Sequence, residues 1–431
     1  ALGQAEGKSW VWKGKVLLDE GEGTEKDLCI VQLSDGGADA VCCREFSLKN
    51  KQFVEGGFTL PECKSTIAYK DRDTLLVGTE FPGRSDSMTD SGYPRVICEW
   101  KRGTELTAAK EVYACKKQHI GAHAWVDQDH GETYEWYYTS LTFYTSEKFL
   151  RRHGHGSGEM VKLQVPDDDS PSTFGDQLLL KLRKAWQPAP SCAEFPAGTL
   201  LAFKVEEALA GDFASPKVLF QPSETRFLQR SPYTTTKNYV LLHLFDNVID
   251  KVECWRYDAT TRSWNNEGEL SVGSGGGIAA LDPSGVDDSS TDQFWLTTSS
   301  YNQPTTLMLA DASKGVNAPT EPLKSLPAMY DASKVTVQQF FATSADGTTV
   351  PYFQCGPAAI DKPTPTLLYG YGGFEISLTP VYAATVGCAW LEHGNVYVHA
   401  NIRGGGEFGP AWHQAALREK RNKAYEDFIA V

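Results

Sequence analysis

Short runs of β-branched and aromatic residues, separated by turn-forming residues, make up almost all of the first 325 residues. Typical runs are residues 9–12, 27–33, 74–77, 95–100, 239–245, 252–257 and 293–297. Runs of this length at this spacing predict antiparallel β-structure. Helical periodicity is confined to residues 205–213, which predict one or two helical turns. The pattern therefore favours an all-β architecture for this part of the chain.

The length of this β-rich part narrows the choice of architecture. Over 300 residues of hairpins is large for one sandwich, whereas a propeller uses about 40–50 residues per blade. The sequence predicts a β-propeller of about seven blades over residues 1–325, with the set of blades complete or incomplete. A pair of sandwiches is the alternative.

The character of the sequence changes near residue 326. The polar stretch 311–326 holds two prolines and predicts a domain boundary, so the second domain covers residues 326–431. There we expect a hairpin around residues 344–348, strands that end at Tyr369 and Ile402, and a helix-compatible stretch at 381–393. An amphipathic helix follows from Pro410, with a shared buried face formed by Trp412, Ala416, Leu417, Tyr425, Phe428 and Ile429. This order of elements predicts an α/β layer structure.

Composition excludes several classes of protein. A formal net charge of −14 disfavours nucleic-acid binding, and Arg418, Lys420, Arg421 and Lys423 alternate with Glu419 on a predicted solvated helix face. No apolar run approaches the roughly 18 residues of a membrane span. The ten cysteines are scattered without a Cys-x-x-Cys pair, which indicates reduced, mostly buried thiols and a cytoplasmic location.

No cofactor or metal ion is expected. The Gly370-x-Gly372 pair lacks the third glycine of a dinucleotide loop, since Glu375 stands there. His119 and His123 are four apart but lie in a strand-and-turn pattern, where they do not share a helix face. The glycine run at 273–277 follows one predicted strand and precedes another, so it predicts a flexible turn.

The glycine-rich loops after the two strands are the candidate site. In residues 369–374, Tyr-Gly-Tyr-Gly-Gly-Phe, glycines let the backbone approach a substrate, and the Tyr371 hydroxyl can donate to an oxyanion. The alternative is a tight turn in which Tyr371 only packs. In the second loop, Arg403 and Glu407 can pair and fix that loop near the first, or both can face solvent.

A nucleophile is missing from the pattern. A nucleophile elbow needs Gly-x-Ser-x-Gly, and no serine of the chain has these neighbours. The nearest match, residues 83–87, has Ser87 in place of the second glycine.

Three segments resemble the prolyl oligopeptidase family of serine peptidases. They are residues 369–374, residues 401–409 (Asn-Ile-Arg-Gly-Gly-Gly-Glu-Phe-Gly), and the following helix with Trp412-His413 and Asp427-Phe428. Residues 90–95 and 99–103 look like the bacterial-type members. The resemblance implies a β-propeller lid on the N-terminal part of an α/β-hydrolase domain.

The same resemblance implies the activity and the roles of individual residues. The parent protein is expected to hydrolyse short peptides after proline, with the propeller gating access, Tyr371 as oxyanion donor and Phe374 lining the substrate pocket. The family's catalytic serine, aspartate and histidine follow the Asp427-Phe428 helix, so residues 1–431 alone are expected to be inactive and to need the missing segment as a partner. A related hydrolase of esters or acyl-peptides, and a non-catalytic propeller scaffold, are the alternatives.

Overall fold

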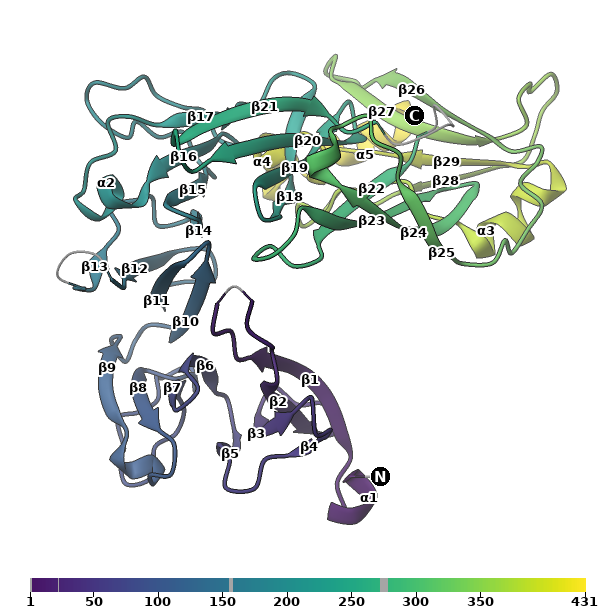
Figure 1. Ribbon diagram of the computed structural model, residues 1–431. Helices are drawn as coiled ribbons and strands as arrows, with labels where there is room; N and C mark the ends of the chain where they lie inside the picture. The colour runs from purple at the N-terminus through teal and green to yellow at the C-terminus, as the bar shows by residue number, and fades with distance from the viewer. Residues whose placement is uncertain (1, 22, 155–157, 272–277) are drawn as a thin grey trace. The chain divides into compact units, whose positions relative to one another are not determined.

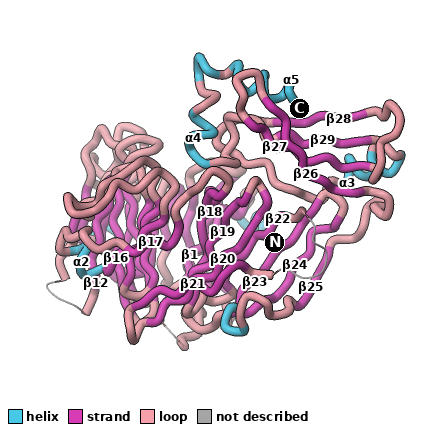
Figure 2. Tube along the Cα trace, turned by 90° about the horizontal axis from the view of Figure 1, so that it is seen from above, coloured by secondary structure: helices cyan, strands magenta, loops and turns pink. Residues whose placement is uncertain are grey.

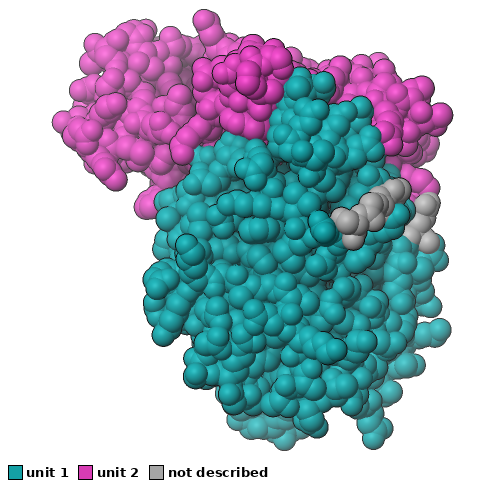
Figure 3. Space-filling view, turned by 90° about the vertical axis from the view of Figure 1, so that its left-hand side faces the viewer, with its two compact units in different colours: residues 1–179, 203–215 teal, residues 180–202, 216–431 magenta. Residues whose placement is uncertain are grey.

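The computed structural model describes residues 2–21, 23–154, 158–271 and 278–431 (Figure 1). The chain divides into two compact units, which Figure 3 colours separately. The first holds residues 1–179 and 203–215, and the second holds residues 180–202 and 216–431. The domain boundary near residue 326 stays a prediction. The glycine run at 273–277 lies outside the described residues.

The first unit begins with helix α1 (Leu2–Glu6), which the sequence pattern did not indicate, and continues as antiparallel sheets. In the first sheet the order is β1-β2-β3-β4, with β5 also paired to β3. The next two sheets have the orders β6-β7-β8-β9 and β10-β11-β12-β13. The bounds are β1 (Trp10–Leu17), β2 (Leu28–Asp35), β3 (Val41–Ser47), β4 (Gln52–Phe53), β5 (Thr59–Cys63), β6 (Thr66–Asp71), β7 (Thr74–Gly78), β8 (Val96–Lys101), 3₁₀-helix η1 (Leu106–Ala108), β9 (Lys110–Ala114), β10 (Gly121–Asp129), β11 (Glu132–Ser140), β12 (Ser146–Arg152) and β13 (Val161–Lys162).

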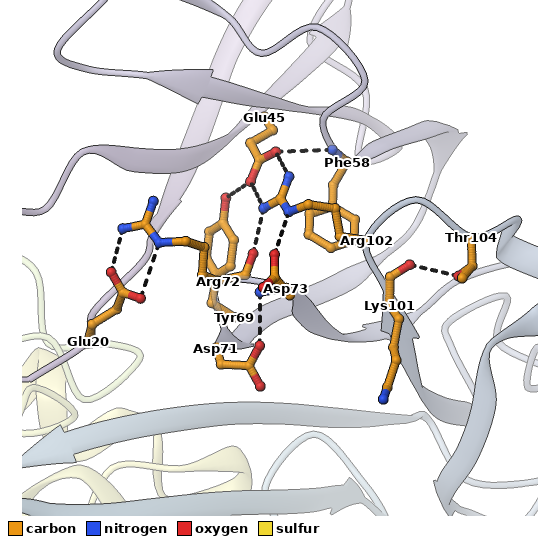
Figure 4. A network of polar contacts seen from close by, with 10 residues as sticks. All are labelled: Glu20, Glu45, Phe58, Tyr69, Asp71, Arg72, Asp73, Lys101, Arg102 and Thr104. Atoms are coloured by element: carbon orange, nitrogen blue, oxygen red, sulfur yellow. Dashed lines mark hydrogen bonds and ion pairs between the residues drawn. The ribbon is translucent and has the colours of Figure 1, made fainter.

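A buried carboxylate joins the first two sheets of this unit (Figure 4). Glu45 of β3 accepts two hydrogen bonds from the Arg102 guanidinium, at 2.7 and 2.9 Å, and one from the Tyr69 hydroxyl at 2.8 Å. The Phe58 amide donates a fourth at 3.2 Å. A buried charge is tolerated only when it is paired and hydrogen-bonded, and these contacts meet both conditions.

A further sheet has the order β14-β15-β16-β17. Its strands are β14 (Ser170–Phe174), β15 (Gln177–Lys181), β16 (Leu200–Lys204) and β17 (Lys217–Phe220). The division between the two units falls within β15 and β16. Helix α2 (Val205–Leu209) follows β16 and confirms the short helix predicted from residues 205–213.

Two more antiparallel meanders follow in the second unit, with the orders β18-β19-β20-β21 and β22-β23-β24-β25. The bounds are β18 (Arg226–Thr235), β19 (Tyr239–Asp246), β20 (Ile249–Asp258), β21 (Ser263–Glu269), β22 (Ala280–Gly285), β23 (Gln293–Ser300), β24 (Gln303–Asp311), 3₁₀-helix η2 (Ala312–Lys314) and β25 (Glu321–Ser325). Within the described part of residues 1–325 the strands thus form six sheets in chain order. Four-stranded meanders of this kind are the units of propeller blades.

The last sheet mixes antiparallel and parallel pairs and carries the candidate site. Its order is β26 (Thr336–Thr343), β27 (Thr349–Gly356), β29 (Val396–Ala400) and β28 (Thr366–Gly370), as the tube view shows (Figure 2). The β26–β27 hairpin is antiparallel, whereas β28 runs parallel to β29. The hairpin and both predicted strands are confirmed.

Both faces of this sheet are covered, because successive side chains of a strand point to opposite faces. Phe353 and Cys355 of β27 pack in a cluster with Leu391 from 3₁₀-helix η3 (Leu391–His393), which follows helix α3 (Ala384–Ala389). Val350 of the same strand packs instead with Ala416 and Ala424, from the chain that follows Pro410. The α/β layering predicted from the sequence is therefore present.

The single helix predicted from Pro410 is wrong. The chain forms α4 (Gly409–Gln414), the 3₁₀-helix η4 (Arg418–Lys420) and α5 (Asn422–Ala430). Leu417 is extended, with φ of −92° and ψ of 147°, which breaks the helix. The predicted shared face is correspondingly incomplete, since Ala416 is buried but Leu417, Tyr425 and Ile429 are exposed.

Seven of the ten cysteines are buried, as predicted. In the part of the chain that the structure describes, no helix combines the length and the apolar character needed to cross a bilayer.

Candidate functional site

The two glycine-rich loops start side by side. Gly370, the last residue of β28, is the register partner of Ala400, the last residue of β29. Because the carboxyl ends of parallel strands lie at the same edge of a sheet, the loop 371–377 and the loop 401–409 leave the sheet together. The second loop therefore begins next to the first.

Glycine is required in both loops because their backbones touch. A Cβ on Gly372, whose φ is +56°, would lie 2.7 Å from the Arg403 carbonyl oxygen. A Cβ on Gly406 would lie 2.5 Å from the Glu375 carbonyl oxygen, and one on Gly404 would collide with the Gly372 carbonyl. Real Cβ atoms do not approach so closely, so any side chain at these positions must displace the other loop.

Tyr371 lies at the start of the first loop with its side chain open to solvent. The residue is 38% exposed, so the ring is not enclosed in a core. Among the described residues none hydrogen-bonds its hydroxyl, which leaves a neutral O–H donor available to an incoming group.

Phe374 stands at the tip of the same loop in a strained conformation. It has φ of +53° and its neighbour Glu375 has φ of +55°, a region that costs a non-glycine residue roughly 1–3 kcal/mol. The Ile376 amide donates to the Gly373 carbonyl at 3.0 Å and closes a turn around them. The Phe374 side chain is 78% exposed, so this strained turn presents an aromatic ring to solvent.

Arg403 and Glu407 are both buried and do not pair with each other, so neither the expected ion pair nor the alternative of solvent exposure holds. Its guanidinium binds Asp427 of α5, with the Nη2–Oδ1 pair at 2.6 Å, and Asp346 of the β26–β27 turn, with the Nη1–Oδ2 pair at 2.6 Å. The Asp427 carboxylate also accepts from the Arg403 amide at 2.9 Å. These hydrogen bonds raise the pKa of Arg403 and hold the pKa of Asp346 well below its usual range. Arg403 therefore ties the base of the second loop to two other segments.

Glu407 has a different set of contacts. The residue is 1% exposed, and its Oε1 accepts from the Leu378 amide at 3.0 Å and from Asn401 Nδ2 at 3.2 Å. Its Oε2 is buried without a hydrogen-bond partner among the described residues. Burial raises the pKa of Glu407 from 4.5 to about 7. The carboxyl thus fastens the end of the first loop, at Leu378, to the second loop.

Two arginines that the sequence did not single out for the site also hold the first loop. Arg421, predicted to lie on a solvated face, donates from Nη1 to the Gly372 carbonyl. Arg183 pairs with Glu375, with Nη2 and Oε2 3.2 Å apart. Lys423, on the same predicted face, binds Asp346 at 3.0 Å. Only the three-dimensional contacts identify these residues, since Arg183 and Glu375 are 192 positions apart in the chain.

Comparison with known proteins matches this chain to a family. The family model described as "Prolyl oligopeptidase family" matches residues 384–431. An uncharacterized peptidase of Sinorhizobium fredii is 37% identical over 438 residues, which cover 100% of this chain and 58% of the relative. The chain belongs to the prolyl oligopeptidase family.

Solved and curated family members extend the match. A post-proline cleaving enzyme from Rickettsia typhi superposes with a TM-score of 0.82 at 27% sequence identity, covering 100% of this chain and 61% of the other. A prolyl endopeptidase of Elizabethkingia miricola is 40% identical over 104 residues, which are 24% of this chain and 15% of the relative. The chain thus spans about three fifths of the length of the relatives that match it throughout.

Proposed function

We propose that the whole protein is a serine oligopeptidase in which Tyr371 donates a hydrogen bond to the oxyanion of the tetrahedral intermediate. The observation that carries the proposal is the position of Tyr371 directly after the carboxyl end of a parallel strand, where the residue is 38% exposed and its hydroxyl has no hydrogen-bond partner among the described residues. Membership of the prolyl oligopeptidase family supports the peptidase chemistry.

In this mechanism a serine attacks the peptide carbonyl, a histidine takes its proton and an aspartate orients the histidine. These three residues would follow Val431 in the whole protein. As the carbonyl oxygen becomes negative, the Tyr371 O–H binds it without bringing a charge of its own. One such donor is worth about 2.7–4 kcal/mol in the transition state. Residues 1–431 alone would therefore not hydrolyse peptides.

We further propose that the substrates are short peptides cleaved after proline. Phe374, three residues after Tyr371 in the same loop, is 78% exposed and supplies an apolar surface that suits a pyrrolidine ring. A relative named prolyl endopeptidase and a neighbour named post-proline cleaving enzyme support this preference. The meanders of residues 1–325 would close as a propeller of about seven blades and restrict entry to small substrates.

The free edge of β28 suggests where further chain would attach. β28 ends the strand order of its sheet, and its Leu367 and Tyr369 are 43% and 46% exposed. An uncovered apolar edge strand promotes association with other chains. We propose that a strand from beyond Val431 pairs with β28 and covers these side chains, as part of an α/β-hydrolase domain.

Tyr371→Phe in the full-length protein tests the proposal, because it removes the hydroxyl and keeps the ring. With a proline-containing peptide, kcat is expected to fall by roughly 10²–10³ while KM changes little. Tyr369→Phe, two residues earlier on β28, is the matched control, because it likewise removes one hydroxyl and keeps the ring, and it should keep full activity. An unchanged kcat in Tyr371→Phe would show that this tyrosine is not the oxyanion donor and only packs.

Two further assays on the wild-type protein separate the alternatives. Labelling by a fluorophosphonate probe identifies an activated serine, and its absence would favour the non-catalytic scaffold. Faster turnover of an ester or acyl-peptide panel than of proline peptides would favour the related hydrolase.

A further inference from the structure

Trp412 and His413, adjacent residues of α4, form hydrogen bonds with the second glycine loop. The Trp412 indole donates to the Ile402 carbonyl at 3.2 Å, and the Trp412 carbonyl accepts from the Gly404 amide at 3.1 Å. Nδ1 of the half-buried His413 lies 2.7 Å from the Gly404 carbonyl oxygen. Nothing in the proposed chemistry uses this histidine.

His413 also reaches the first loop, at the strained turn. Its Nδ1 is 3.1 Å from the Glu375 amide nitrogen, which is in turn 3.3 Å from the Gly404 carbonyl oxygen. One ring nitrogen, one amide and one carbonyl therefore form a triangle between the two loops. His413 contributes the one side-chain atom of this triangle, since the other two atoms belong to the backbones of the two loops.

The tautomer of the ring decides which of these contacts is a hydrogen bond. With a hydrogen on Nδ1, the ring donates to the Gly404 oxygen at 2.7 Å, and the Glu375 amide donates to the same oxygen at 3.3 Å, so Gly404 is the common acceptor for both loops. With a lone pair on Nδ1, the ring instead accepts from the Glu375 amide at 3.1 Å. In both tautomers His413 is hydrogen-bonded at the point where the two loops meet.

His413 and Arg421 together hold both ends of the segment that follows Tyr371. Arg421 binds the Gly372 carbonyl, and the His413–Gly404 pair binds the Glu375 amide. Between these points lies the Phe374–Glu375 turn with two positive φ angles, a conformation that persists only where surroundings impose it. Without these contacts the turn would relax and the side chains before and within it would change direction.

We propose that His413 is a positioning residue that fixes the orientation of Tyr371 and Phe374 through the Gly404 carbonyl. The inference rests on the proposed function, because Tyr371 must be the oxyanion donor for its orientation to affect catalysis. His413 itself does not touch the substrate.

A mutant cycle in the full-length enzyme tests the inference. His413→Ala should lower kcat by about 10- to 100-fold, since a misplacement of about 1 Å can cost that much. His413→Asn places an amide where Nδ1 lies and should recover most of the activity. Gln414→Ala, at the exposed neighbour on the same helix, is the control and should leave kcat unchanged.

The double variant His413→Ala with Tyr371→Phe distinguishes positioning from a general loss of structure. If His413 acts through Tyr371, the double variant should be no slower than Tyr371→Phe alone. Losses that multiply, or an unchanged kcat in His413→Ala when Tyr371→Phe is slow, would overturn the inference and leave the proposed function intact. An unchanged kcat in Tyr371→Phe would overturn both.

Hydrogen exchange gives a readout that does not depend on turnover. The amides of residues 373–376 should exchange faster in His413→Ala than in His413→Asn or the wild type. Equal exchange in all three proteins would show that the turn does not depend on this histidine, and would refute the inference even if a variant were inactive.

Discussion

Replacing Glu407 by glutamine tests whether this buried carboxyl makes the stability of the protein depend on pH. Burial raises the pKa of Glu407 from 4.5 to about 7, so the folded protein holds the proton where the unfolded chain has released it. A raised carboxyl pKa contributes stability that is fully present below the unfolded value of 4.5 and is lost as the pH rises through about 7. Glutamine removes this titration while it keeps an acceptor for Leu378 and Asn401.

The magnitude follows from the size of the pKa shift. One unit corresponds to about 1.4 kcal/mol, so the rise to about 7 is worth about 3 kcal/mol between about pH 4.5 and pH 8. The free energy of unfolding of the wild type should fall by this amount relative to Glu407→Gln over that range. The glutamine amide group replaces the unpartnered Oε2, and the free-energy cost of that change is independent of pH, so it cancels from the comparison of pH profiles.

The assay is urea unfolding of both proteins at several pH values, followed by tryptophan fluorescence. Glu419→Gln removes an exposed carboxyl from the same part of the chain. The pH profile of its free energy of unfolding should run parallel to that of the wild type. Parallel pH profiles for the wild type and Glu407→Gln would refute the reasoning, because the carboxyl would then titrate alike in the folded and unfolded chain. Hydrogen exchange at the Leu378 amide, which binds Glu407, reports the same change locally.

Two further predictions concern the residues around the loops. Arg403→Met should destabilise the protein by about 3–5 kcal/mol, because it leaves the buried Asp427 carboxylate without its partner; a fall of under about 1 kcal/mol in denaturant unfolding would contradict this. Phe374→Gly should raise the stability of the loop by roughly 1 kcal/mol, because glycine adopts the positive φ without strain and little ring burial is lost. The same variant should have a higher KM for proline peptides. An unchanged KM would exclude the ring from substrate binding.

The strands and loops of the site could be predicted because their signals are local. The apolar runs before Gly370 and Asn401 indicate strands, and the glycines after them indicate a close approach of backbones, which the contact between Gly372 and Gly404 confirms. Whether Tyr371 donates to an oxyanion or only packs was not decided locally, since both alternatives use the same sequence. The structure leaves this residue 38% exposed, and its role as a donor is the proposal that Tyr371→Phe tests.

The partners of the charged residues could not be predicted because they come from distant segments. Arg403 and Glu407 are opposite charges four positions apart, a spacing that brings side chains together on a helix but not in a loop. Arg403 instead finds Asp427, 24 positions away, and Asp346, 57 positions away. Likewise, the periodicity after Pro410 indicates one helix, whereas the helix is interrupted at Leu417 and Arg418. Arg421, beyond this interruption, binds the Gly372 carbonyl. Tertiary contacts overrule the local pattern at both places.

The interlocked glycines of the two loops also determine how the protein would tolerate variation. Because a Cβ at Gly404 or Gly406 strikes the backbone near Gly372 or Glu375, a substitution in either loop is transmitted to the other. If every single replacement is made and sorted by activity, the intolerant positions of both loops should form one set of residues that are neighbours in space. Within that set, the severity would follow the contacts between the loops rather than the distance of each position from the bond that is cut.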